Sequence, residues 1–117
     1  MVQLKAWDLG GHDQVRTLWK DYFVETDAIV FVVDSADSDR FDEAKKELEM
    51  LLKEPHLSNC TLLILGNKID LITSAPANDL IRYLGIENAL NDENSKRKIK
   101  VLKKWFCIRY GYRKQKV

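Results

Sequence analysis

A short apolar run followed at once by a polar loop occupies residues 62–70, with the sequence LLILGNKID. We predict a strand over Leu62–Leu65 that stops at Gly66, because a brief apolar run bounded by a turn signal is typical of a buried strand. The loop Asn67–Asp70 then follows the carboxyl end of that strand, where nucleotide-binding α/β proteins place their ligand loops. This stretch therefore predicts both a strand and a candidate binding loop.

The residue types in this loop suit a guanine base. The carboxylate of Asp70 can accept two parallel N–H bonds from the edge of the base, an arrangement that adenine cannot reciprocate. The stem of Lys68 can lie along the ring, and Asn67 can brace the loop. A solvated turn between a strand and a helix is the alternative that this motif alone leaves open, since three fixed positions also recur by chance.

A second motif, WDLGGH, occupies residues 7–12 after the strand-like stretch Leu4–Leu9. A carboxylate such as Asp8 can hold a water on Mg²⁺, a hard cation that takes oxygen ligands. Gly11 leaves its backbone N–H bare for the close approach of a phosphate oxygen. His12 can orient a water for in-line attack, although a tight turn with an exposed histidine is the alternative. The two motifs together, each after its own strand, favour a γ-phosphate sensor and a guanine-reading loop.

Strand-like and helix-like segments alternate along the chain, which predicts an α/β fold with a parallel sheet. The apolar run Ala28–Val33 is expected to be buried on both faces of that sheet. Ser38 or Asp39 is expected to cap the following helix. We expect strands at Leu4–Leu9, Ala28–Val33, Leu62–Leu65 and Ile99–Cys107, helices at His12–Phe23, Asp39–Lys53 and Asp79–Leu84, and a polar loop at Asn88–Ser95.

Length and composition indicate one small globular domain, since 45% of the 117 residues are hydrophobic. The apolar runs are too short for a membrane span, and the start of the sequence is not typical of a secretory signal. Two cysteines suggest no disulfide framework and fit a reducing compartment. Charge is divided unevenly: residues 1–95 hold 9 Lys or Arg and 18 Asp or Glu, whereas residues 96–117 hold 10 Lys or Arg and no acid.

The basic end of the chain interleaves cations with Trp105, Phe106, Tyr110 and Tyr112. Such a segment can bind RNA or an anionic membrane. We favour the simpler interpretation, an edge strand whose lysines discourage aggregation, followed by a frayed end. The sequence therefore does not predict a nucleic-acid partner.

At these motifs the chain resembles the Sar family of small GTPases, close kin of the Arf family. Trp7–His12 looks like the entry to their switch II, and Sar members carry a histidine where this chain has His12, whereas Arf members carry a glutamine. The likeness is dense from about residue 4 to residue 85 and looser beyond. Other segments that match are Leu18–Phe23, Ile29–Asp34, Asp39–Ala44 and Ile64–Asp70.

This resemblance implies a partial Ras-like P-loop GTPase fold in which the first strands are missing, with residues 1–107 as the domain and residues 108–117 as a basic tail. It implies GTP or GDP and Mg²⁺ as ligands. Asp8 would touch Mg²⁺ through water, Gly11 would sense the γ-phosphate, and His12 would position the attacking water. The guanine-reading residues would be Asn67, Lys68 and Asp70.

The resemblance also implies a cellular role. A Sar-type GTPase assembles the coat of vesicles that leave the endoplasmic reticulum for the Golgi. The implied partners are coat subunits, one of which supplies an arginine in trans, together with GTPase-activating and exchange proteins. The expected location is the cytoplasm, at the surface of the endoplasmic reticulum.

Three departures from the family pattern shape our expectations. First, the 117 residues contain no Gly-x-x-x-x-Gly-Lys-Ser/Thr loop, no switch I and no amphipathic membrane helix. Second, Ile108 follows Cys107 at a position where the family usually has serine. Third, a basic tail replaces the closing helix. We therefore expect a truncated chain with weak stability, little nucleotide affinity and impaired GTP hydrolysis. The alternatives are a non-catalytic module that binds coat subunits and a nucleic-acid or membrane binder acting through its tail.

Overall fold

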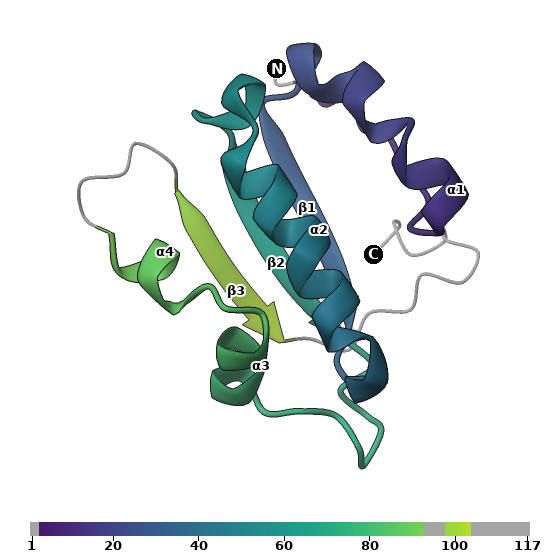
Figure 1. The fold of residues 1–117 in the computed structure, drawn as a ribbon, viewed down its shortest axis with the longest axis vertical. Coiled ribbons are helices and arrows are strands. Elements are labelled where there is room, and N and C mark those ends of the chain that lie inside the picture. Colours follow the sequence, from purple (N-terminus) through teal and green to yellow (C-terminus); the bar gives the residue numbers. More distant parts are fainter. Residues whose placement is uncertain (1–2, 93–97, 104–117) are drawn as a thin grey trace.

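The computed structural model describes residues 3–92 and 98–103 and contains a three-stranded parallel sheet in the order β1-β2-β3 (Figure 1). The strands are β1 (Ala28–Asp34), β2 (Thr61–Asn67) and β3 (Ile99–Lys103). Parallel strands require crossover connections, which helices supply here. The predicted α/β class with a parallel sheet is confirmed.

Helix α2 (Phe41–Lys53) connects β1 to β2 and lies across one face of both strands (Figure 1). Its apolar stripe faces the sheet, and Leu48 at its middle has no exposed surface. Leu48 packs in one cluster with Val33 and Ile64, and a smaller cluster is built around Phe23. These two clusters form the core, so α2 is fixed firmly on the strands that carry the candidate loops.

The connection from β2 to β3 contains α3 (Ala77–Tyr83) and α4 (Glu87–Asn91). The predicted helix that Gly85 closes is confirmed as α3, and Gly85 has a φ of +68°, a conformation that glycine adopts without strain. The predicted polar loop over Asn88–Ser95 is wrong for its first residues, because α4 covers them and its Leu90 packs against the main core cluster.

The predicted strand at Leu4–Leu9 is wrong: this segment is irregular coil in the structure. A strand forms only where it finds a hydrogen-bonding partner and a surface on which to bury its side chains. In the described residues β1 pairs with β2 alone, and the side chains of Leu4 and Trp7 are 87% and 53% exposed. The segment therefore gains neither the ladder nor the burial that would make it a strand.

The predicted helix over His12–Phe23 is broken into two pieces. Helix α1 covers only Asp13–Arg16, and the 3₁₀ helix η1 covers Trp19–Glu25. The hydroxyl of Thr17 donates to the carbonyl of Gln14 at 3.1 Å, a local bond of the kind that competes with continued helix. The break lets η1 turn so that Phe23 enters the smaller core cluster.

Two details of the sheet region also differ from expectation. Strand β1 is buried on one face only, since Val30 and Val32 are 58% and 45% exposed on the side away from α2. Neither Ser38 nor Asp39 caps α2; instead the 3₁₀ helix η2 (Ser38–Arg40) leads into it through backbone hydrogen bonds. The remaining short 3₁₀ helix, η3 (Pro55–Leu57), precedes β2.

The predicted strand Ile99–Cys107 is confirmed over Ile99–Lys103. Its remainder, the basic tail and the boundary after residue 107 lie outside the described residues. Over the part of the chain that is described, no helix combines the length and the apolar character needed to cross a bilayer.

Candidate functional site

The carboxyl ends of β1 and β2 bring two polar residues side by side. Asp34 and Asn67 are register partners at the last position of the parallel pair. Asn67 is almost fully buried, and its carbonyl accepts a hydrogen bond from the amide of Ser35 at 3.2 Å. Because both strands end at the same edge, the loops that follow them share one rim of the sheet.

The guanine-reading loop predicted from the sequence begins at this rim with an unusual backbone. Lys68 has a φ of +61°, the only positive value among the described residues other than glycine. Its ammonium lies 2.9 Å from a carboxylate oxygen of Asp34. This ion pair joins the loop after β2 to the end of β1.

The charges of that pair shift each other's titration. Partial burial alone raises the pKa of Asp34, but hydrogen bonds from the Lys68 ammonium and the Ala36 amide outweigh burial and leave that pKa below its ordinary value. The same contact with Asp34 raises the pKa of Lys68. Both groups are therefore held in their charged forms at neutral pH.

The rest of the loop is open on its outer side. Ile69 and Asp70 are exposed, so the carboxylate of Asp70 is accessible to a base. The amide of Ala75 donates to the carbonyl of Ser35 at 2.8 Å, which ties the far end of the loop back to the end of β1. Buried beneath it, the hydroxyls of Ser35 and Ser74 make no hydrogen bond within the described residues.

The other predicted site residues, Asp8, Gly11 and His12, lie in the coil before α1 and are exposed. Gly11 borders open space, since a β-carbon added there would meet nothing within 4 Å. A β-carbon at Gly10 would instead lie 3.1 Å from a methyl group of Val15. The backbone at Gly11 is therefore accessible to a ligand, whereas that at Gly10 packs on α1.

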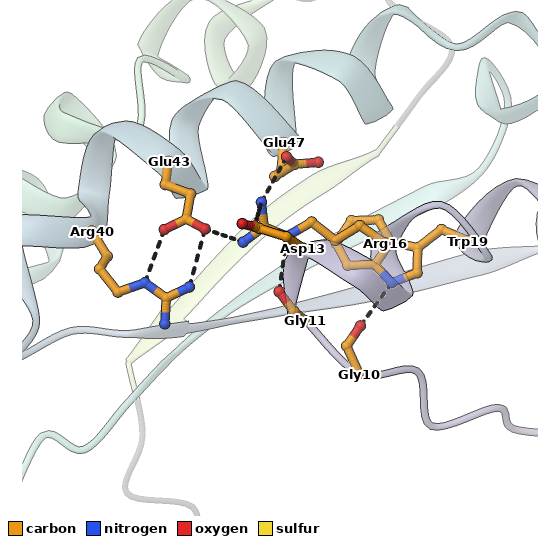
Figure 2. A network of polar contacts seen from close by, with 8 residues as sticks. All are labelled: Gly10, Gly11, Asp13, Arg16, Trp19, Arg40, Glu43 and Glu47. Carbon is orange, nitrogen blue, oxygen red and sulfur yellow. Dashed lines mark hydrogen bonds and ion pairs between the residues drawn. The ribbon is translucent and has the colours of Figure 1, made fainter.

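Two side chains hold the carbonyl oxygens of these glycines (Figure 2). The indole of Trp19 donates to the carbonyl of Gly10 at 2.9 Å, and the Nε of Arg16 donates to the carbonyl of Gly11 at 2.8 Å. Sequence reasoning did not identify Arg16 or Trp19 as site residues. The sequence did contain one signal: Arg16 is a cation five positions after Gly11, and Glu43 and Glu47 are acids on α2 that lie off its apolar stripe.

The guanidinium of Arg16 also reaches α2, where its Nη1 donates to Glu47 at 2.9 Å and its Nη2 pairs with Glu43. Glu43 is held from the other side by Arg40, which donates to both of its carboxylate oxygens at 2.9 and 3.1 Å. Hydrogen bonds from Arg40 and Arg16 lower the pKa of Glu43 to about 2. Figure 2 shows the two guanidinium groups converging on this single carboxylate.

These contacts connect the first motif to the first turns of α2. Gly11 is bonded to Arg16, which pairs with Glu43, which pairs with Arg40. The charge of Arg40 in turn favours the ionised form of Asp34, the partner of Lys68. The structure therefore links the Gly11 loop to α2 by direct contacts, whereas the Lys68 loop is linked by direct contact to Asp34 at the end of β1.

Among the predicted site residues, Asp8 is the candidate contact for a magnesium ion. In the described ranges no three His, Cys, Asp or Glu side chains gather as a metal site. Mg²⁺ keeps most of its waters and uses one or two carboxylates together with phosphate oxygens, so an exposed carboxylate such as that of Asp8 fits its requirements.

Comparison with known proteins shows the family to which the chain belongs. Residues 1–115 match the model of the ADP-ribosylation factor family. The chain belongs to the ADP-ribosylation factor family, within the Arf/Sar group of small GTPases. The small COPII coat GTPase SAR1 of Giardia intestinalis is 36% identical to it over 117 positions. That comparison covers 95% of this chain and 61% of the relative, so the chain spans about three fifths of that relative's length.

Proposed function

We propose that this chain forms the switch and guanine-recognition part of a Sar-type GTP-dependent switch that controls vesicle coat assembly at the endoplasmic reticulum. The observation that carries the proposal is that each motif is fixed by side chains from elsewhere in the fold: Arg16, anchored on Glu43 of α2, holds the Gly11 carbonyl, and Asp34 at the end of β1 holds Lys68. Both motifs thus keep a defined loop geometry, as residues that contact a nucleotide must. The relative's description as a COPII coat GTPase supports the assignment to coat assembly.

Each predicted residue receives a role that its environment permits. The N–H of Gly11 meets the γ-phosphate, and the exposed imidazole of His12 orients the attacking water. Asp70 reads the edge of guanine, while Lys68 and Asn67 shape the loop. Mg²⁺ bound near Asp8 would neutralise phosphate charge.

The 117 residues contain no glycine-rich phosphate loop, which supplies most of the phosphate-binding energy in this class. We therefore propose that this stretch alone binds guanine nucleotides weakly and hydrolyses GTP slowly. GTPase-activating and exchange proteins and coat subunits are the proposed partners, and the cytoplasmic surface of the endoplasmic reticulum is the proposed location.

The decisive experiment exchanges the base specificity. Asp70→Asn replaces a carboxylate that accepts two N–H bonds with an amide that donates one and accepts one. Xanthine carries an oxygen where guanine carries an amino group, so the variant should prefer xanthosine diphosphate, whereas the unaltered chain prefers guanosine diphosphate. Titration of the fluorescent nucleotides, followed by anisotropy, measures both affinities.

Asp21→Asn is the matched control, because Asp21 is an exposed carboxylate in η1, outside both motifs. It should retain the guanine preference of the unaltered chain. Equal affinity of the Asp70→Asn variant for both bases, or no guanine preference in the unaltered chain, would refute the assignment of Asp70.

A second candidate function is a non-catalytic module that binds coat subunits. Leu18 and Val24, in the segment that follows His12, are 52% and 77% exposed. Exposed apolar side chains of this kind favour protein contacts. Capture of a coat subunit that is equally strong with GTP, with GDP and without nucleotide would support the module, whereas capture dependent on GTP supports the switch.

A further inference from the structure

The two carbonyl contacts in the loop before α1 determine where two backbone N–H groups point. A trans peptide is planar, and its C=O and N–H point in opposite directions. The bond from Trp19 to the carbonyl of Gly10 therefore fixes the direction of the Gly11 N–H. In the same way, the bond from Arg16 to the carbonyl of Gly11 fixes the direction of the His12 N–H.

This loop needs such fixing because glycine has the widest backbone freedom of any residue. Two consecutive glycines, Gly10 and Gly11, would sample many orientations if nothing held their peptide planes. Arg16 is suited to hold them because its side chain is only 14% exposed and every nitrogen of its guanidinium makes a contact. A planar guanidinium engaged at several nitrogens keeps a defined orientation.

The anchor for Arg16 is rigid. Glu43 and Glu47 both project from α2, and Leu48 in the same helix is completely buried in the core. The second guanidinium on Glu43, that of Arg40, restricts the carboxylate further. The helix that packs on the sheet thereby contributes to the position of the loop, in addition to the backbone hydrogen bonds from Val15 and Arg16 to the carbonyl of His12.

From this geometry we propose that Arg16 and Trp19 are positioning residues that aim the N–H groups of Gly11 and His12 at the terminal phosphate of a nucleoside triphosphate. The proposal rests on the function proposed above. Arg16 and Trp19 would thus determine the preference for a triphosphate over a diphosphate without touching the nucleotide themselves. Binding of the base and of the first two phosphates does not depend on them.

The test compares Arg16→Lys, which keeps the charge and loses the fork, with Trp19→Phe, which keeps an aromatic ring and loses the indole N–H. Each variant should lower the ratio of affinities for a non-hydrolysable GTP analogue and for GDP by about tenfold, the effect of one lost hydrogen bond to a bound group. The affinity for GDP should stay unchanged. Arg82→Lys is the matched control, because Arg82 is exposed on α3, pairs among the described residues with the neighbouring Asp79, and should leave the ratio unaltered.

A second measurement on the same 117-residue proteins uses amide hydrogen exchange. Exchange of the peptide that covers residues 10–16 should accelerate at least about tenfold in both variants, while exchange of β2 stays unchanged. Unaltered amide exchange around Gly11 in both variants overturns the proposal. If the unaltered protein prefers the GTP analogue to GDP and both variants keep the same affinity ratio, the proposal is overturned as well. If the unaltered chain binds neither nucleotide, the proposed function fails, and the role of Arg16 and Trp19 in phosphate sensing fails with it. The exchange data then still decide whether these two side chains hold the loop.

Discussion

Lys68 and Asp34 form an ion pair of 2.9 Å that joins the loop after β2 to the end of β1. Neither residue is deeply buried, with 54% and 34% of their side chains exposed. The pair nevertheless matters to the site, because Lys68 has a positive φ that a residue other than glycine adopts only at a cost. The ion pair offsets part of that cost and ties the loop after β2, the proposed guanine-reading loop, to the end of β1.

Asp34→Asn should therefore affect binding more than stability. Because the pair is exposed and screened by solvent, its loss should lower the free energy of unfolding by only about 0.5 kcal/mol. The loop loses its ion pair with the end of β1 but keeps the backbone hydrogen bonds to Ser35, so the affinity for guanine nucleotides should fall while the urea unfolding midpoint shifts little. Parallel unfolding and nucleotide titrations check this, and a large loss of stability with unchanged affinity would contradict it.

Acid should weaken the attachment of the loop before α1 to α2. The pKa of Glu43 is lowered from an ordinary value of 4.5 to about 2. A carboxyl group with a lowered pKa contributes stability that is complete above its ordinary pKa and is lost as the pH falls through the lowered value. The contribution of Glu43 should thus decline between about pH 4.5 and pH 2.

Glu43→Gln isolates this contribution. The amide cannot ionise, so the variant should be less stable at pH 7 and should show a flatter dependence of the urea midpoint on pH below about 4.5. Exposed Glu49, which lies on the same helix, provides the control through Glu49→Gln. Identical pH profiles for Glu43→Gln and the unaltered chain would show that the two arginines do not act on this carboxylate.

Two glycine substitutions should separate folding from phosphate sensing. Gly85→Ala places a β-carbon at a φ of +68° and 2.8 Å from the side chain of Lys45, so it should destabilise the fold by roughly 1–2 kcal/mol. Gly11→Ala meets no atom within 4 Å and should leave stability unchanged. The added methyl group would stand where a phosphate approaches, so Gly11→Ala should lose the preference for triphosphate. Thermal unfolding and nucleotide competition measure the two effects.

The core should tolerate little loss of packing. Leu48→Ala removes a fully buried side chain from α2 and should cost about 2–5 kcal/mol. Since a small domain has only about 5–15 kcal/mol of stability, the variant should unfold at much lower urea or lack a cooperative transition. Leu4→Ala, at a position that is 87% exposed, should change the midpoint little.

The same unfolding experiment tests the weak stability expected from the sequence. A single steep urea transition would argue against weak stability if the free energy of unfolding depends on urea concentration as expected for about 100 ordered residues. A shallow transition, or one at low urea, would agree with a sheet in which β1 exposes Val30 and Val32 on the face away from α2.

Local patterns in the sequence predicted the parts of the fold that depend on neighbouring residues. The apolar runs at β1 and β2, the stripe of α2 and the turn at Gly85 all follow from spacing along the chain. The two motifs were likewise recognisable, because each consists of a few consecutive residues. Membership of the Arf/Sar group followed from those motifs.

Other features depended on partners distant in the sequence, and only the tertiary structure decided them. Leu4–Leu9 has the composition of a strand but finds no ladder among the described residues, and the helix expected after His12 breaks so that Phe23 can reach the core. The contacts of Arg16 with Glu43 and of Lys68 with Asp34 span 27 and 34 positions. No local pattern specifies such pairs, because packing of α2 on the sheet is what brings their charges within hydrogen-bonding distance.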